Sequence, residues 1–169
     1  GAVSENKYSL LSGKTLGVDY LDEMTKAAAK TAGDFGMQVT AMIKGQMTKD
    51  QRDFIEDYGI STLTSAADIF RSSDFVLVHS SDEKDRGQLA FNEFEKIKKG
   101  SYLIDISPVD IIDPYALSAA VEKNHLAGAV IDIADRARIA GDVFKDERII
   151  LTYRNILSTR EPELNAITD

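Results

Sequence analysis

The amino-acid sequence predicts a doubly wound α/β fold, in which helices cover both faces of a parallel sheet. Short apolar, β-branched segments alternate along the chain with segments of helical pattern, in repeated strand–helix–strand units. One apolar segment, Phe75–His79 (FVLVH), is unbroken, as strands buried on both faces of a parallel sheet require. The 169 residues suit one domain. We expect this domain to span 1–169, with 1–12 as a leading segment and 155–169 as a C-terminal tail or helix.

The first half of the chain supplies three of the predicted strands and two helices. Lys14–Tyr20 (KTLGVDY) is apolar and β-branched, which predicts the first strand. The alanine-rich segment Leu21–Ala32 has high helix propensity. Met37–Ile43 (MQVTAMI) predicts the second strand, and Lys49–Tyr58 predicts a polar helix that a glycine ends. Ile60–Thr64 is a short third strand.

A further helix and the central strands follow. Ser65 is placed to cap a helix that runs to Arg71, with Asp68 in the capping-box position. Phe75–His79 is the next strand. Glu93–Lys99 predicts a helix with a basic last turn and a glycine after it, an arrangement that suits the helix dipole. Tyr102–Ile106 is the strand that follows.

The last predicted elements locate the edge of the sheet where a ligand would bind. Asp113 caps a helix that has Pro114 at its first position and runs to Asn124. Leu126–Ile133 and Arg148–Tyr153 complete the strands. Ligands of such sheets bind beyond the carboxyl ends of the strands, at the switch point near the first strand. The loops at that edge are Asp19–Thr25, Ile43–Lys44, His79–Asp82 and Ser107–Asp110.

Composition excludes several classes of protein. A net charge of -8 argues against nucleic acid or an anionic membrane as a partner. The absence of cysteine excludes disulfides, thiol catalysis and thiolate metal sites, and it fits the cytoplasmic location that we expect. No apolar run approaches the roughly 18 residues of a membrane span.

Five segments resemble, in order and with similar spacing, the NAD-binding domain of the D-isomer-specific 2-hydroxyacid dehydrogenases, the group that includes phosphoglycerate and formate dehydrogenases. They are Leu11–Met24 (LSGKTLGVDYLDEM), Ser73–His79, Arg86–Ile106, Leu126–Ile133 and Ile149–Thr152. The resemblance implies a Rossmann-like fold and a homodimer. In that family a substrate domain wraps around this one from both ends and completes the cleft where NAD receives hydride. We expect the substrate domain to be absent here.

The positions that bind the cofactor in the family are substituted in this chain. The three glycines of the family's G-x-G-x-x-G turn fall on Tyr20, Asp22 and Thr25. The acidic residue that holds the adenosine ribose falls on Ile43. His79 stands where the family also has a histidine. The resemblance therefore implies a vestigial cofactor site, and we expect no cofactor to bind.

The catalytic positions are also substituted. The substrate-binding arginine of the family falls on Pro108. Its acid–base pair, a glutamate and a histidine, falls on about Ala137 and on Arg154. The register near Ala137 is irregular, and Asp135 is an alternative position for the carboxylate. No catalytic residue is predicted.

The substitutions oppose pyrophosphate binding through both bulk and charge. Tyr20 adds a side chain where the backbone must approach the phosphates, and Thr25 adds bulk where helix and strand meet. Asp22, with Asp19 and Glu23, brings up to three carboxylates to the same place. At an effective dielectric constant of ~20, one like-charge pair at ~6 Å costs on the order of 2–3 kcal/mol before screening. NAD is therefore not expected to bind in the family's mode.

Two interpretations of the acidic cluster remain open. Either Asp19 or Asp22 caps the helix and takes the place of the anion, or the acids form a site for a hard cation such as magnesium or calcium. We favour the cap, and no metal site is predicted. His79 has a structural role or contacts a ligand. His125 lies in an exposed turn and has no predicted function.

Other polar residues are interpreted as structural. Ser80 and Ser81 adjoin His79 but lack the elbow motif of a nucleophile. The carboxylates Asp105, Asp110 and Asp132 are expected to accept hydrogen bonds, and Asp105 takes the place of a backbone-bracing asparagine of the family. Lys44 is either a surface lysine or a contact for a 2′-phosphate. The basic run at 96–99 is a helix end.

Three hypotheses for the function follow. The first is a non-catalytic Rossmann-like module kept for dimerisation, protein interaction or ligand sensing, with a homodimer as the expected assembly and a partner protein or a substrate domain as further partners. The second is an NAD- or NADP-dependent oxidoreductase acting on the CH–OH group of a 2-hydroxy acid, or the cofactor-binding domain of one. The third is a pocket for an uncharged or cationic small molecule at the switch point.

Overall fold

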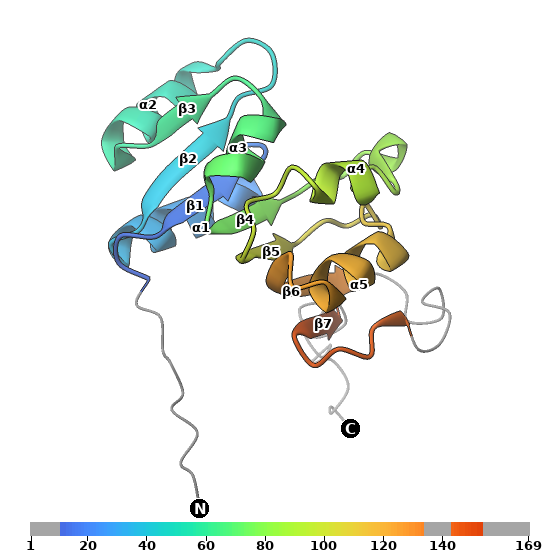
Figure 1. Cartoon of the computed structure of the whole chain (residues 1–169). Helices are drawn as coiled ribbons and strands as arrows, with labels where there is room; N and C mark the ends of the chain where they lie inside the picture. Colours follow the sequence, from blue (N-terminus) through green and yellow to red (C-terminus); the bar gives the residue numbers. More distant parts are fainter. Residues whose placement is uncertain (1–10, 134–142, 154–169) are drawn as a thin grey trace, which may run out of the picture.

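The computed structural model describes residues 11–133 and 143–153, and it confirms the predicted fold class (Figure 1). Seven strands in these residues form one parallel sheet in the order β3-β2-β1-β4-β5-β6-β7. The strands are β1 (Thr15–Val18), β2 (Gln38–Met42), β3 (Ser61–Leu63), β4 (Phe75–Val78), β5 (Ser101–Asp105), β6 (Leu126–Ile133) and β7 (Ile149–Tyr153). The helices are α1 (Glu23–Asp34), α2 (Lys49–Tyr58), α3 (Ala66–Ser72), α4 (Phe91–Phe94) and α5 (Pro114–Glu122), with a short 3-10 turn at Glu83–Asp85.

The helices lie on both faces of the sheet and bury one apolar cluster on each (Figure 1). On the face of α1 and α2, which we call the α1 face, Leu16 and Val18 of β1 pack with Ala29 of α1. On the opposite face, Val76 of β4 packs in a cluster with Leu117 of α5 and with residues of α3 and α4. The alternation of side chains along each strand supplies both clusters from the same sheet.

Polar side chains start the four longer helices. Asp22, Thr48, Ser65 and Asp113 each accept hydrogen bonds from amides in the first turn of α1, α2, α3 and α5. These bonds satisfy amides that have no partner within the helix. The predicted caps at Ser65 and Asp113 are confirmed. No helix of the described residues is long and apolar enough to cross a membrane.

The predicted helix Glu93–Lys99 is wrong. The structure has only the short helix α4 at Phe91–Phe94, and turns follow it. The Lys98 amide donates to the Phe70 carbonyl of α3, so it is not available to continue a helix. The preceding amides of Lys96 and Ile97 bond three residues back, which tightens the chain into turns. A tertiary contact with α3 therefore ends this helix early.

Part of the α1 face has no helix over it among the described residues. The register of β4, β5, β6 and β7 places Phe75, Tyr102, Ile104, Val130 and Ile150 on this face. Phe75 and Tyr102 stack with ring centroids 5.2 Å apart. Beside them lies an apolar groove of about 680 Å³, which α1 borders. Parallel sheets usually bury both faces, so this apolar surface lacks the covering layer that such sheets usually have, as far as residues 11–133 and 143–153 show.

Candidate functional site

The carboxyl edge of the central strands gathers the titratable residues of the candidate site. The chain runs from β1 to β2 and β3 on one side of β1 and then crosses to β4 on the other side. The switch point therefore lies between β1 and β4. Asp19 follows β1, His79 follows β4, and Asp105 ends β5. The structure thereby brings together three of the loops that the sequence predicts at this edge.

Asp22 occupies the N-terminus of α1. Its Oδ1 accepts hydrogen bonds of 2.9 Å from the amides of both Met24 and Thr25. In return, the Thr25 Oγ1 accepts from the Asp22 amide at 2.9 Å and donates to the Tyr20 carbonyl at 2.8 Å. Thr25 is fully buried. Of the two predicted capping residues, Asp22 is therefore the one that caps the helix.

His79 holds the second oxygen of the same carboxylate. Its Nδ1 lies 2.5 Å from Oδ2 of Asp22, and its backbone amide donates to Oδ1 of Asp19 at 3.2 Å. Burial opposes ionisation of Asp22, but hydrogen bonds from the Thr25 amide and from His79 outweigh burial, and the pKa of Asp22 is lowered. The structural interpretation of His79 fits this geometry: a buried imidazole anchors an ionised carboxylate at the positive end of α1.

Two further carboxyls at this edge are held in environments that disfavour charge. Burial raises the pKa of Asp19 to about 6, although the His79 amide and the charge of Lys44 act against it. Burial likewise raises the pKa of Asp105 to about 6, against the hydrogen bonds from Ser107. The Asp105 Oδ1 accepts from the Ser107 amide at 2.8 Å, which fits the predicted bracing role. The Ser107 hydroxyl in turn accepts from the Ser80 amide and so joins the loops after β4 and β5.

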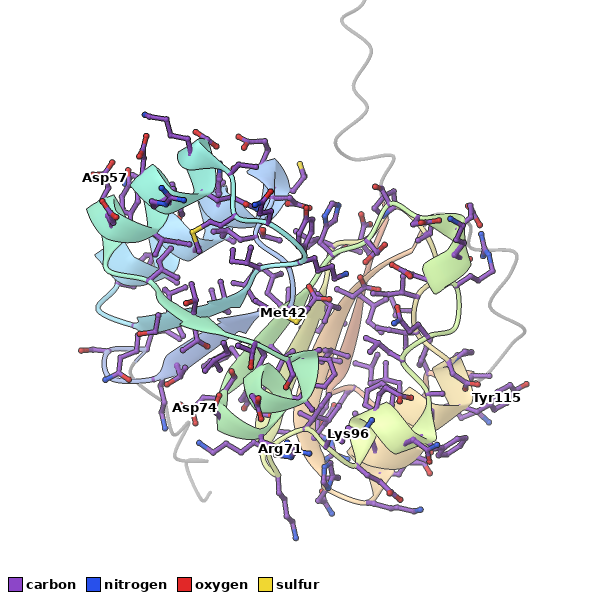
Figure 2. The ribbon with its side chains drawn as sticks, turned by 90° about the horizontal axis from the view of Figure 1, so that it is seen from above. Met42, Asp57, Arg71, Asp74, Lys96 and Tyr115 are labelled. Atoms are coloured by element: carbon purple, nitrogen blue, oxygen red, sulfur yellow. The ribbon has the colours of Figure 1, made fainter. Side chains whose placement is uncertain are left out.

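A cavity of about 260 Å³ opens beside Asp19, on the face of α3. Met42 of β2, which is labelled in Figure 2, lines it together with Lys44 and Ser80. Lys44 is exposed, and its ammonium lies 5.1 Å from the centroid of the Tyr20 ring. This cavity thus lies beyond the end of β2. At the start of α1, by contrast, the Tyr20 carbonyl, Asp22 and Thr25 are hydrogen-bonded to one another or to His79.

Some expected residues lie elsewhere. His125 is partly buried, not exposed as predicted, because its Nε2 is hydrogen-bonded to the Ile97 carbonyl at 2.8 Å. Asp110 accepts a hydrogen bond from Arg86 at 2.7 Å, as predicted for a structural carboxylate. Glu23 forms an ion pair with Lys26 at 2.8 Å. The positions Asp135, Ala137 and Arg154 lie outside the described residues.

The remaining candidates show no metal or nucleophile arrangement. Within residues 11–133 and 143–153, no three histidine, aspartate or glutamate side chains are placed to hold a metal ion. The Ser80 hydroxyl donates to Asp85 rather than to a histidine. Ile43, which stands at the family position for the ribose-binding carboxylate, is partly buried and packs against the apolar cluster on the α1 face.

Sequence reasoning missed the pairing of Asp22 with His79. Fifty-seven positions separate these residues in the chain. The available signal was indirect: an aspartate at a helix start and a histidine at the end of the neighbouring parallel strand meet at the same edge of the sheet.

The family described as "D-isomer specific 2-hydroxyacid dehydrogenase, NAD binding domain" matches residues 2–153. D-3-phosphoglycerate dehydrogenase of Bacillus subtilis is 31% identical over 159 residues, which are 93% of this chain and 29% of that protein. The chain therefore spans less than a third of that relative.

Solved structures show the same fold. The apo form of D-mandelate dehydrogenase from Rhodotorula graminis superposes with a TM-score of 0.76 at 20% identity, over 85% of this chain and 42% of that one. The NAD-complexed form of a D-isomer specific 2-hydroxyacid dehydrogenase from Lactobacillus delbrueckii ssp. bulgaricus gives a TM-score of 0.73 at 18% identity, over 90% of this chain and 49% of that one.

Proposed function

The chain belongs to the D-isomer specific 2-hydroxyacid dehydrogenase family, in its NAD-binding domain, and we propose that it is a non-catalytic Rossmann-like module whose pyrophosphate cradle is filled by its own Asp22. The family positions for the glycine turn fall on Tyr20, Asp22 and Thr25. The family positions for catalysis fall on Pro108, about Ala137 and Arg154. No step of hydride transfer is assigned to these residues.

One observation carries this proposal: the Asp22 carboxylate already uses the amides at the start of α1. A pyrophosphate at this helix end needs the same N–H donors. To admit it, Asp22 must give up two amide hydrogen bonds and its contact with His79. Hydrogen bonds to a charged group contribute about 1.5–3 kcal/mol each, so displacement is costly. Tyr20 and Thr25 add bulk at the same turn.

We expect NAD and NADP at 1 mM to leave the melting temperature of the protein unchanged, as measured by differential scanning fluorimetry and checked by isothermal titration. The reason is that the Asp22 carboxylate is part of the protein. It binds the helix amides without the loss of translational freedom that a free dinucleotide undergoes. Asp22→Ser is the matched variant, because its hydroxyl still caps α1 while the negative charge is removed. We expect dinucleotide affinity to rise in this variant by at least about tenfold, because one like-charge pair costs on the order of 2–3 kcal/mol before screening.

A dissociation constant for NAD below about 1 mM in the unaltered protein would refute the proposal. Equal binding by the unaltered protein and by Asp22→Ser would also show that Asp22 does not block the cradle.

The second candidate function is an NAD(P)-dependent oxidoreductase acting on the CH–OH group of a 2-hydroxy acid, or the cofactor-binding domain of a longer one. The family match and the 260 Å³ cavity beside Asp19 and Lys44 favour it. The same titration distinguishes the two, since this function requires the dinucleotide to bind.

We also propose that the chain forms a homodimer through the uncovered part of the α1 face. Met24 and Phe35 of the α1 side are 60% and 62% exposed, and Tyr102 and Ile150 of the sheet are 44% and 56% exposed. At about 200 Å² for a fully exposed large side chain, these four leave roughly 450 Å² of apolar surface in water. Each partner in a standard interface buries about 800 Å². The patch supplies more than half of that area, and a two-fold axis would place it against itself.

Sedimentation velocity from 1 to 200 μM is expected to show a concentration-dependent dimer. Ile150→Lys should shift the equilibrium to monomer, because it places a charge within the apolar patch, on its β7 side. Tyr115→Lys is the control: Tyr115 is 63% exposed on α5, on the opposite face, and its substitution should leave the dimer intact (Figure 2). A monomer at every concentration, or equal loss of dimer in both variants, would contradict this assignment.

A further inference from the structure

A groove between α4 and α5 lies at the amino edge of β5 and β6, opposite to the edge that carries Asp22. We call it the α4–α5 groove. It consists of two adjoining hollows of about 250 Å³ and 830 Å³, both of which are lined by Glu95, Lys99 and His125. Lys99 comes just before β5 and His125 just before β6. Neither the cofactor cradle nor the uncovered sheet face includes these residues.

The smaller hollow has an apolar floor. Phe94 is buried beneath it, and the alanines of α5 at 116, 119 and 120 leave space that larger side chains would fill. Phe91 stands at its border and is 52% exposed. A half-exposed aromatic beside small residues is the kind of slot that receives a single apolar side chain of a partner.

The rest of the groove is basic, in a chain whose net charge is -8. Arg71, Lys96, Lys98 and Lys99 line the larger hollow, and Lys123 lines the smaller one. Figure 2 shows Arg71 of α3 and Lys96 after α4 near each other at the same side of the molecule. Glu95 is the acidic residue of both linings.

The cations differ in what they already contact. Arg71, Lys96 and Lys98 pair with Asp68, Glu93 and Asp74 respectively. Among the described residues, no carboxylate lies within ion-pair distance of Lys99 or Lys123. These two lysines line the smaller hollow together with His125, and their ammonium groups are therefore available to a carboxylate from outside.

We infer that the α4–α5 groove binds an acidic peptide segment of a partner protein, in which one apolar side chain enters the slot beside Phe91 and neighbouring carboxylates meet Lys99 and Lys123. Charge complementarity selects an acidic occupant, and the apolar floor selects a peptide side chain over a free inorganic anion. Two adjoining hollows that share Glu95, Lys99 and His125 can receive successive side chains of one extended segment. This inference is independent of whether NAD binds at the other edge of the sheet.

The test is selection from a random twelve-residue peptide library displayed on phage, with the full chain immobilised. Enriched peptides are expected to combine at least two acidic residues with a large apolar residue. The double variant Lys99→Glu/Lys123→Glu should lower retention of the enriched clones at least tenfold. Its control, Lys49→Glu/Lys84→Glu, makes the same change in net charge at exposed lysines on α2 and in the 3-10 turn, and should change retention less than twofold.

A second variant tests the contribution of the smaller, apolar hollow separately from that of the lysines. Ala119→Phe fills the smaller hollow from the partly exposed side of α5 and leaves all the lysines in place. It should also lower retention about tenfold, with an unchanged melting temperature as evidence of folding. Enrichment of neutral or basic peptides, no enrichment, or equal retention by the charge-reversed variant and its control each overturns the inference. Amide shifts at Lys99 and His125 with inorganic phosphate alone, and no enriched peptide, would indicate a small-anion site instead.

Discussion

Replacing Gly17 with alanine is expected to destabilise the protein by on the order of 2–3 kcal/mol, because the new methyl group has no space. A Cβ at this position of β1 would lie 2.0 Å from the Ser73 Oγ and 2.7 Å from the Ile69 Cγ2. Ser73 cannot easily move, since it is fully buried and its hydroxyl donates to the Ile69 carbonyl at 2.6 Å. The end of α3 therefore packs directly on the backbone of β1.

Gly33→Ala is the matched control. Gly33 lies in the last turn of α1, and a Cβ there would meet nothing within 4 Å. This substitution should stabilise the protein by about 0.5–1 kcal/mol, because alanine loses less conformational freedom in a helix. Guanidinium unfolding of the two variants measures both effects. Similar unfolding midpoints for the two variants would show that α3 does not pack on β1 as described.

The free energy of unfolding is expected to fall as the pH rises from about 4 to about 7. Asp19 and Asp105 have pKa values raised to about 6, whereas an aspartate in the unfolded chain titrates near 3.8. Between these values the folded protein binds more protons than the unfolded chain, so its stability decreases with pH. A raised pKa of this size corresponds to at most about 3 kcal/mol for each group. His79, Lys44 and Asp132 are the charged or titratable neighbours of the pair.

Below about pH 4 the dependence should reverse. The pKa values of Asp22 and Asp74 are lowered: hydrogen bonds outweigh burial at Asp22, and the Lys98 ammonium is the main cause at Asp74. Their stabilising contribution is present above the unfolded pKa and is lost as the pH falls through the folded pKa. The protein should therefore be most stable near pH 4.

Asp105→Asn tests the origin of this dependence. Asparagine keeps an oxygen to accept from the Ser107 amide and cannot ionise, so the variant should gain about 2 kcal/mol at pH 8 and lose much of the slope. Asp57→Asn on the exposed side of α2 is the control for loss of one negative charge (Figure 2). Urea unfolding at several pH values measures both. Stability that is constant or rises from pH 4 to pH 7, or equal behaviour of the two variants, would contradict the assignment.

Local patterns were sufficient to predict most of the elements. Strand Leu126–Ile133 and helix Lys49–Tyr58 have the predicted bounds, and Ser65 and Asp113 cap helices as expected. These features depend on alternation, propensity and capping, which act over a few residues. The helix predicted at Glu93–Lys99 failed because the Lys98 amide bonds to Phe70, twenty-eight positions earlier in the chain.

The candidate site divides in the same way. That Asp22 stands near a helix start can be predicted from the residues alone, whereas its place at a glycine position of the family, and the conflict between its charge and a pyrophosphate, are implied by the resemblance. That His79 holds the other oxygen of this carboxylate depends on β1 and β4 lying side by side. The burial that raises the pKa values of Asp19 and Asp105 likewise arises only when several strands end together.

Local pattern thus predicts the parallel α/β architecture, because alternation and helix propensity act over a few residues, and the resemblance of five segments to a known family implies the family and the substituted glycine turn. Folding in three dimensions decides which carboxylate caps α1, which part of the α1 face has no helix over it among the described residues, and which lysines of the α4–α5 groove have no ion-pair partner there. These depend on the packing of segments that are far apart in sequence, and no short-range pattern encodes the distances between them.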